Sequence, residues 1–177
     1  MAASLGFLSV RQHPEHGYFG GYLLTNLAAR PLEFHCTMPV KPSRAQELLY
    51  GPTLDDFVCG EQIAKALVNK AKLKPDLVLT NCRAVLAIAQ VSNVLTAQLQ
   101  FEADDSFPHF RTPQGNQSGL QSLVVDPWQL QLPASVQGAE EKVRSLLSQL
   151  AANFDLTEPF QRVSDALLEA HPIAKAA

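Results

Sequence analysis

Alternating apolar and polar positions predict three strands near the start of the chain. The predicted strands span residues 6–10, 18–25 and 31–37, with turn-forming residues between them. Successive side chains of each strand should point to opposite faces of a sheet. Because the connections are short, we expect the three strands to form an antiparallel meander.

A helical period replaces the alternation after the third strand. Ser43 and Gln46 have the spacing of a capping box, which predicts a short helix that ends at Gly51. A longer helix is predicted over residues 54–73, where apolar positions recur three and four residues apart. Gly60 inside this helix lowers its stability, which indicates tight packing against a neighbouring element.

A continuous apolar run over residues 76–80 predicts a central strand that is buried on both faces. A helix over residues 82–90 and an alternating strand over residues 94–101 follow it. This order predicts a strand–helix–strand crossover with parallel strands. Residues 102–122 are polar and rich in Gly, Pro and Ser, which predicts a long loop.

Toward the end of the chain, a short strand is predicted over residues 123–126. Two amphipathic helices are predicted over residues 139–150 and 158–169. A length of 177 residues suits one domain with a core. We expect one domain over residues 1–177, divided into a mixed-sheet core (6–101), the loop (102–122) and a C-terminal strand with helices (123–177). The predicted fold class is α/β with α+β character.

This order, a three-strand meander followed by a βαβ unit, resembles the ribonuclease-H-like sheet. It also resembles the core of the inosine-specific DNA endonucleases, in which a similar PDL-type strand follows a long helix. The resemblance covers roughly residues 6–101 and implies that fold. Two-metal nucleases of that class carry one carboxylate on the first strand and another at the end of the fourth. Here the first strand reads GFLSV, the fourth ends at Asn81, and Asp76 stands at its beginning.

The resemblance therefore implies a nuclease-like core without its catalytic acids, and we assign no catalytic residue. The segments RPLEFHCT and PVKPSRAQELLYG also look like those of a bacterial protein family of unassigned function, which implies no mechanism.

The composition, with 46% hydrophobic and 18% charged residues, favours a globular protein over a disordered one. A net charge of −3 gives no basic excess that would indicate a nucleic-acid surface, although a local basic patch stays open. No apolar run reaches the roughly 18 residues of a membrane span, so no membrane partner is expected. The first residues, MAASLGFLSV, do not resemble a signal peptide, which predicts a cytoplasmic protein with reduced thiols.

Imidazole and thiol groups that suit Zn²⁺ gather in one stretch, at His13, His16, His35 and Cys36. Because side chains alternate along a strand, His35 and Cys36 face opposite sides and only one of them can join a given site. One interpretation is a metal site of His13, His16 and His35. The other places Cys36 in the core, His35 on the opposite sheet face, and the other histidines in an exposed loop.

The same stretch holds all three tyrosines of the chain, Tyr18, Tyr22 and Tyr50, together with the adjacent glycines Gly20 and Gly21. Aromatic residues beside glycines are common in binding surfaces and in cores alike. The glycine pair predicts a bulge, a sharp coil or the close approach of another backbone.

Two basic residues, Lys41 and Arg44, flank the start of the short helix, where free backbone N–H groups favour an anion. The alternative is an ordinary capped helix with solvated charges. Of the thiols, Cys82 stands at a helix start beside Arg83 and is a better candidate for a reactive group than Cys59, which should pack in the core.

Three hypotheses of function follow. The first is a non-enzymatic domain that binds another protein, as a homodimer or as a subunit of a bacterial cytoplasmic assembly, through Tyr18, Tyr22, Lys41, Arg44 and Tyr50. The second is a nucleic-acid-associated protein with a degenerate nuclease-like core, in which Lys41, Arg44 and Arg83 bind phosphate. The third is a metal-dependent hydrolase at the three histidines, and only this hypothesis requires a cofactor, Zn²⁺.

Overall fold

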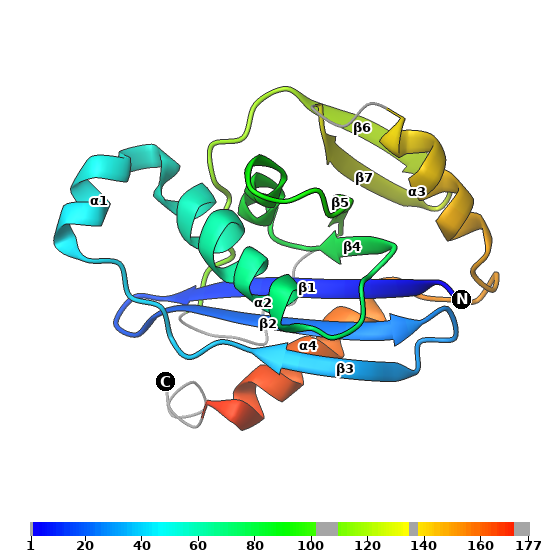
Figure 1. The fold of residues 1–177 in the computed structure, drawn as a ribbon, viewed down its shortest axis with the longest axis horizontal. Coiled ribbons are helices and arrows are strands. Elements are labelled where there is room, and N and C mark those ends of the chain that lie inside the picture. Colours follow the sequence, from blue (N-terminus) through cyan, green and yellow to red (C-terminus); the bar gives the residue numbers. More distant parts are fainter. Residues whose placement is uncertain (1, 102–109, 135–137, 172–177) are drawn as a thin grey trace.

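The computed structural model of the protein describes residues 2–101, 110–134 and 138–171. Within these residues, seven strands form one mixed sheet in the order β3-β2-β1-β4-β5-β7-β6, so the protein has an α/β fold (Figure 1). The strands are β1 (Ser4–His13), β2 (Gly17–Asn26), β3 (Pro31–Cys36), β4 (Leu77–Thr80), β5 (Thr96–Gln100), β6 (Leu120–Val125) and β7 (Trp128–Pro133). The helices are α1 (Arg44–Tyr50), the 3₁₀-helix η1 (Gly51–Thr53), the π-helix η2 (Asp56–Ala64), α2 (Lys65–Lys70), the 3₁₀-helix η3 (Arg83–Gln90), α3 (Ala139–Ser148) and α4 (Glu158–Ala170).

The pairing of the first five strands confirms the predicted arrangement. β2 pairs antiparallel with both β1 and β3, which is the predicted meander. β4 pairs parallel with both β1 and β5, which is the predicted crossover. The fold class predicted from the sequence is therefore correct for this part of the sheet.

The strand β7 was not predicted from the sequence. β6 begins at Leu120, inside the predicted loop, and forms an antiparallel hairpin with β7, which also pairs with β5. The alternation in WQLQLP is a strand pattern, and its pairing continues the sheet beyond β5, which is mostly buried between β4 and β7.

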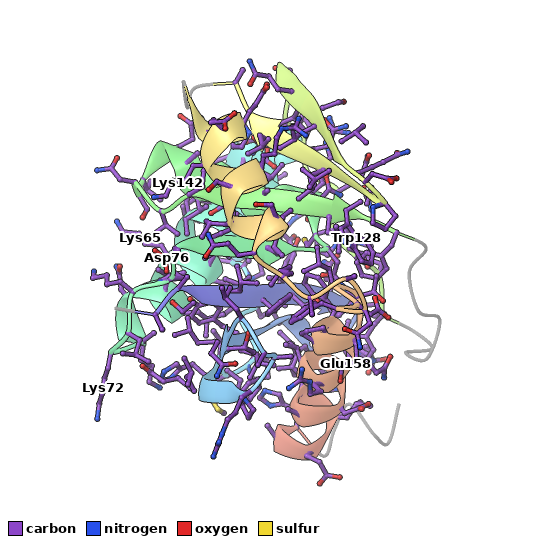
Figure 2. The ribbon with its side chains drawn as sticks, turned by 90° about the vertical axis from the view of Figure 1, so that its right-hand side faces the viewer. Lys65, Lys72, Asp76, Trp128, Lys142 and Glu158 are labelled. Atoms are coloured by element: carbon purple, nitrogen blue, oxygen red, sulfur yellow. The ribbon has the colours of Figure 1, made fainter. Side chains whose placement is uncertain are left out.

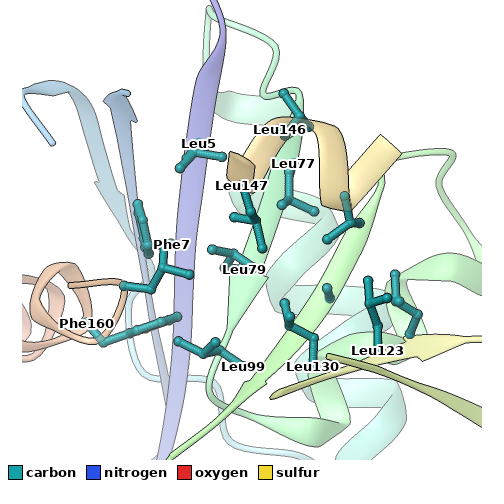
Figure 3. Packing of buried hydrophobic residues seen from close by; sticks show 14 of the residues in the cluster. Leu5, Phe7, Leu77, Leu79, Leu99, Leu123, Leu130, Leu146, Leu147 and Phe160 are labelled. Carbon is teal, nitrogen blue, oxygen red and sulfur yellow. The ribbon is translucent and has the colours of Figure 1, made fainter. Parts of the chain in front are cut away.

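One face of the sheet packs against α3 and α4. Figure 3 shows leucines of the central strands meeting Leu146 and Leu147 of α3. Phe7 of β1 lies edge-to-face against Phe160 of α4, with ring centroids 5.4 Å apart. Figure 2 views the end of the molecule that carries α3, with α4 below it. These contacts make one of two hydrophobic clusters.

The opposite face of the sheet packs against η2, α2 and η3 and makes the second cluster. η2 and η3 also pack closely on each other, because an added Cβ at Gly60 would lie 2.6 Å from the Cβ of Ala87. The tight packing predicted at Gly60 is therefore present. The predicted helix over residues 54–73 is divided, however, into the π-helix η2 and the α-helix α2.

The glycine pair of β2 lies where helices press on both faces of the sheet. A Cβ added at Gly20 would lie 2.3 Å from Ile63 of η2, and one added at Gly21 would lie 2.8 Å from Val163 of α4. The register of β1 with β2 runs through both glycines without a bulge. The close approach predicted at this pair is thus made by helix side chains, from both sides.

Candidate functional site

α1 projects from the end of the molecule opposite α3 (Figure 1). The Ser43 hydroxyl accepts the Gln46 N–H at 3.2 Å, and the Gln46 side chain accepts the Ser43 N–H at 3.0 Å, which confirms the predicted capping box. Gly51 ends the helix with a φ of 51°, a conformation that favours glycine. None of the side chains of α1 is buried. We call α1 and the residues that lead into it, 38–50, the arm.

The arm exposes three large apolar side chains. Met38 is 78% exposed, Leu48 66% and Leu49 85%. At 3.6 residues per turn, Arg44 and Leu48 lie about 40° apart on one side of α1, Leu49 points about 100° further round the helix, and Tyr50 about 100° further again. The outward side of the arm is therefore apolar, with a guanidinium group beside it.

The base of the arm holds a cleft of about 390 Å³. One wall is made by Tyr50 and Phe57, whose rings stack with centroids 4.1 Å apart and an interplanar angle of 12°. The cleft is lined by side chains of the arm, η1, η2, η3 and the segment that precedes β6: Tyr50, Thr53, Asp56, Phe57, Glu61, Ala87, Gln90, Asn116, Gln117 and Ser118. We call this the base cleft.

The π-helical geometry of η2 places two carboxylates of the base cleft on one side of the helix. A π-helix closes its hydrogen bonds between residues i and i+5, so Asp56 and Glu61 follow each other along one face. In an α-helix, at 3.6 residues per turn, these two positions would point about 140° apart. A continuous α-helix over the same residues would not bring both side chains to the cleft.

The base cleft is acidic. The Asp56 Oδ2 atom accepts the Asn116 N–H at 3.1 Å, while its Oδ1 atom is buried without a hydrogen-bond partner among the described residues. Glu61 has neither an ion pair nor a side-chain hydrogen bond with any residue in the described ranges. None of the lining side chains is a lysine or arginine. An aromatic wall with an unpaired carboxylate suits a cation, and above all a guanidinium group.

A second carboxylate, Asp55, fixes the start of η2. It accepts two hydrogen bonds from Arg111, at 2.9 and 3.0 Å, and one from the Tyr18 hydroxyl at 2.6 Å. Burial raises the pKa of Asp55, but the bonds from Arg111 and Tyr18 outweigh it, and the pKa lies below its usual value. Burial and the bond to Asp55 raise the pKa of Tyr18. This group connects β2, η2 and the segment at residue 111 and is structural.

Two tyrosines predicted to bind a partner belong to the core instead. Tyr18 is 1% exposed and Tyr22 is fully buried in the cluster beneath η2. The prediction is wrong because both faces of the sheet are covered at β2, so neither face of this strand meets solvent. The other three predicted binding residues, Lys41, Arg44 and Tyr50, belong to the arm, with Arg44 and Tyr50 at opposite ends of α1.

The three histidines predicted to bind a metal do not meet. His13 and His16 stack with centroids 4.6 Å apart, and His13 Nδ1 accepts the backbone N–H of Glu15 and His16. His35 bonds instead to the Glu33 carboxylate at 2.8 Å. The register places His35 opposite Tyr22 and Tyr22 opposite Leu8.

Leu8 stands five positions before His13 on β1, which is about 16 Å along the strands at 3.3 Å per residue. The predicted metal site therefore fails on the strand register, because His35 is too far from the other two. Over residues 2–101, 110–134 and 138–171, no group of three or more His, Cys, Asp or Glu side chains is arranged to hold a metal ion.

The carboxyl ends of the parallel strands β1 and β4 carry no acid. The Ser9 hydroxyl donates to the Asn81 Oδ1 atom at 2.8 Å, and buried Arg11 donates to Ser9 at 3.1 Å. Asp76 precedes β4, where its carboxylate accepts the Ser4 N–H at 2.8 Å. Asp76 thus joins β1 to β4 at the other end of the strands.

Arg83, predicted with Lys41 and Arg44 to bind phosphate, comes from a separate element. It belongs to η3, where its guanidinium group donates to the Gln117 carbonyl at 2.8 Å and its Nε atom is buried. The three cations therefore come from η3 and from the arm.

Cys82, the better candidate of the two for a reactive thiol, is fully buried, and its Sγ atom donates to the Pro113 carbonyl at 3.1 Å. It is not exposed for reaction, because the chain around Pro113 covers the start of η3. Cys59 is buried beside it, as predicted, and burial and Cys82 raise its pKa well above the usual value.

Comparisons with known proteins assign this chain to no family: no family model matches it, and no curated protein sequence does. Among the helices of the described residues, none is long and apolar enough to cross a membrane.

Only part of the candidate site was predicted from the sequence: Lys41, Arg44 and Tyr50 were, whereas Leu48, Leu49 and the base cleft were not. The leucines could have been found, because a helix between Pro42 and Gly51 is too short to bury a face of its own. The cleft could not, because it depends on the π-helical spacing of Asp56 and Glu61.

Proposed function

We propose that this protein is a non-enzymatic binding domain that self-associates through the arm and acts as an assembly subunit. The observation that carries the proposal is that no side chain of α1 is buried, although Leu48 and Leu49 stand 66% and 85% exposed on it. A second copy of the chain is the occupant that we propose for this surface.

Apart from Tyr50, which stacks on Phe57, α1 contributes little to the packing of the described residues. Isolated helices shorter than about 12–15 residues are marginal in water, and most helix stability in proteins comes from packing an apolar face. α1 has seven residues, and none of them is buried against the described residues. A partner that covers Leu48 and Leu49 would supply the missing packing.

The outward side of the arm suits a two-fold contact. C₂ dimers are by far the commonest oligomers, and they bring the same patch of both subunits together. A two-fold axis across the leucines would pack two α1 helices antiparallel. Each leucine buried in such a contact contributes roughly 1.5–3 kcal/mol.

The free energy gained by burying the leucines limits how tight a dimer they can hold alone. Four buried leucines contribute roughly 6–12 kcal/mol, against an association cost of about 4–15 kcal/mol. A dimer held by these side chains alone is therefore weak, and a tight one needs further contacts.

Sedimentation equilibrium of the full chain tests the proposal. We expect the wild type to dimerise and a Leu48→Ser/Leu49→Ser variant to raise the dimer dissociation constant at least tenfold. Val124→Ser is the matched control, because Val124 is 58% exposed on β6, away from the arm. A monomeric wild type, or a dimer that the double variant leaves unchanged, would contradict the proposal.

A further inference from the structure

The base cleft has the groups to bind a cation, and the chain itself exposes a suitable one. Resting on the proposed self-association, we propose that Arg44 of each copy binds in the base cleft of the other, against the Tyr50–Phe57 wall and the Glu61 carboxylate. The contact is made twice in the dimer, once in each direction, and the site is incomplete without the second copy.

On the cleft side of this contact, the described residues leave the Glu61 carboxylate without a cation. Glu61 has no ion pair among the described residues, and all charged side chains that line the cleft are acidic. Two cations near the cleft already have partners: Arg83 donates to the carbonyl of the lining residue Gln117 at 2.8 Å, and Arg111 is held by Asp55 through two hydrogen bonds. The Glu61 carboxylate thus keeps its negative charge beside an aromatic surface, and the two together favour a guanidinium group.

Arg44 is available for the contact. Among the described residues its one partner is Glu47, through a 3.3 Å contact between side chains that are 78% and 44% exposed. Such exposed pairs on a helix contribute little to stability and give way readily to a better partner. A carboxylate beside aromatic rings in a partly enclosed cleft is a better partner for arginine than a solvated glutamate.

The geometry of α1 favours a contact between copies over one within a copy. Arg44 begins the helix and Tyr50 ends it, so the two lie about 9 Å apart along the axis and on different sides. In an antiparallel pair, the start of one helix meets the end of the other. Arg44 is then carried to the end of its partner's helix, beyond which η1 leads into the base cleft, while Leu48, one turn after Arg44 and on the same side, packs at the axis.

Charge exchange between two variants tests this contact directly. Arg44→Glu and Glu61→Arg each place like charges at both contacts of a homodimer, and each should raise the dissociation constant at least tenfold. A one-to-one mixture of the two variants restores opposite charges at both contacts. Native mass spectrometry should therefore show heterodimers in the mixture, because the variants differ in mass, while each variant alone remains monomeric.

Three controls keep the outcomes distinct. The Arg44→Glu/Glu61→Arg double variant should dimerise again. Glu140→Arg makes the same charge change on α3, at the opposite end, and should leave the dimer unchanged. Thermal unfolding of every variant by circular dichroism separates a lost contact from a lost fold.

The possible results separate this inference from the proposal beneath it. If the leucine variant is monomeric but both charge variants dimerise like the wild type, Arg44 does not bind the cleft, and self-association through the arm stands. If the double variant recovers while the mixture does not, the pair forms within one chain and the inference is wrong. If the wild type is monomeric, both proposals are wrong.

Discussion

α1 and α4 both carry large apolar side chains, but only α4 packs them against the sheet. α4 buries Phe160, Val163 and Leu167 in the cluster that includes Phe7. α1 carries Leu48 and Leu49 and buries neither. The two helices show that apolar residues on a helix mark a surface to be covered, and that the covering element need not belong to the same chain.

The largest expected effect comes from removing the packing of α4. Phe160→Ala deletes the edge-to-face contact with Phe7 and leaves a cavity in the cluster, which should lower the free energy of unfolding by about 3–5 kcal/mol. Chemical denaturation measures the loss. Gln161→Ala, at the exposed neighbouring position, should change it by less than about 0.5 kcal/mol. A loss below about 1 kcal/mol for Phe160→Ala would contradict this account of α4.

A smaller effect is expected at the end of α2, which a carboxylate of the edge strand β3 holds by hydrogen bonds. The Glu33 carboxylate accepts the N–H groups of Lys72 and Leu73 at 3.0 and 2.7 Å. The hydrogen bond from His35, with these backbone bonds, lowers the pKa of Glu33 from 4.5 to about 2.

Because the pKa of Glu33 is lower in the folded state, its contribution to stability is present above about pH 4.5 and is lost as the pH falls toward 2. The unfolding midpoint of the wild type should therefore fall through this window more steeply than that of Glu33→Gln. Glu47→Gln, an exposed glutamate of α1, should follow the wild type. Identical pH profiles for Glu33→Gln and the wild type would show that the Glu33 bonds do not persist in solution.

The smallest effect is expected in α1. Leu48→Ser/Leu49→Ser should change the free energy of unfolding by less than about 1 kcal/mol, because surface substitutions that lose no packing rarely exceed 0.5 kcal/mol each. The measurement belongs at a concentration where sedimentation finds only monomer. A loss of the size expected for Phe160→Ala would mean that the leucines pack within their own chain, and the comparison of α1 with α4 would fail.

The sheet could be predicted because its rules are local. Short connections force neighbouring strands to be antiparallel, and a strand–helix–strand unit makes parallel ones, so β1 to β5 followed from element order. The capping box of Ser43 and Gln46 likewise fixed the start of α1 from sequence.

The candidate site was only partly predictable, because it depends on which side chains are buried and on the backbone geometry of η2. Alternation separates the two faces of β2, but it does not show that helices cover both, so Tyr18 and Tyr22 were misplaced at a surface. The metal prediction failed because the strand register separates His35 from the other two histidines. The short distance in sequence between His16 and His35 does not reveal this register. Helical spacing alone likewise does not show that η2 is a π-helix, and so could not place Asp56 beside Glu61.

Gly20 and Gly21 make the sheet unusually thin at one point. Between Ile63 on one side and Val163 on the other, only main chain is present, because both helices reach the backbone of β2 directly. Side chains elsewhere can absorb a small shift of a helix by changing rotamer, but at this point none stands between the layers. η2 forms one wall of the base cleft, and α4 lies on the far side of the sheet. We therefore expect the two helices to move together, so that a displacement of one also displaces the other.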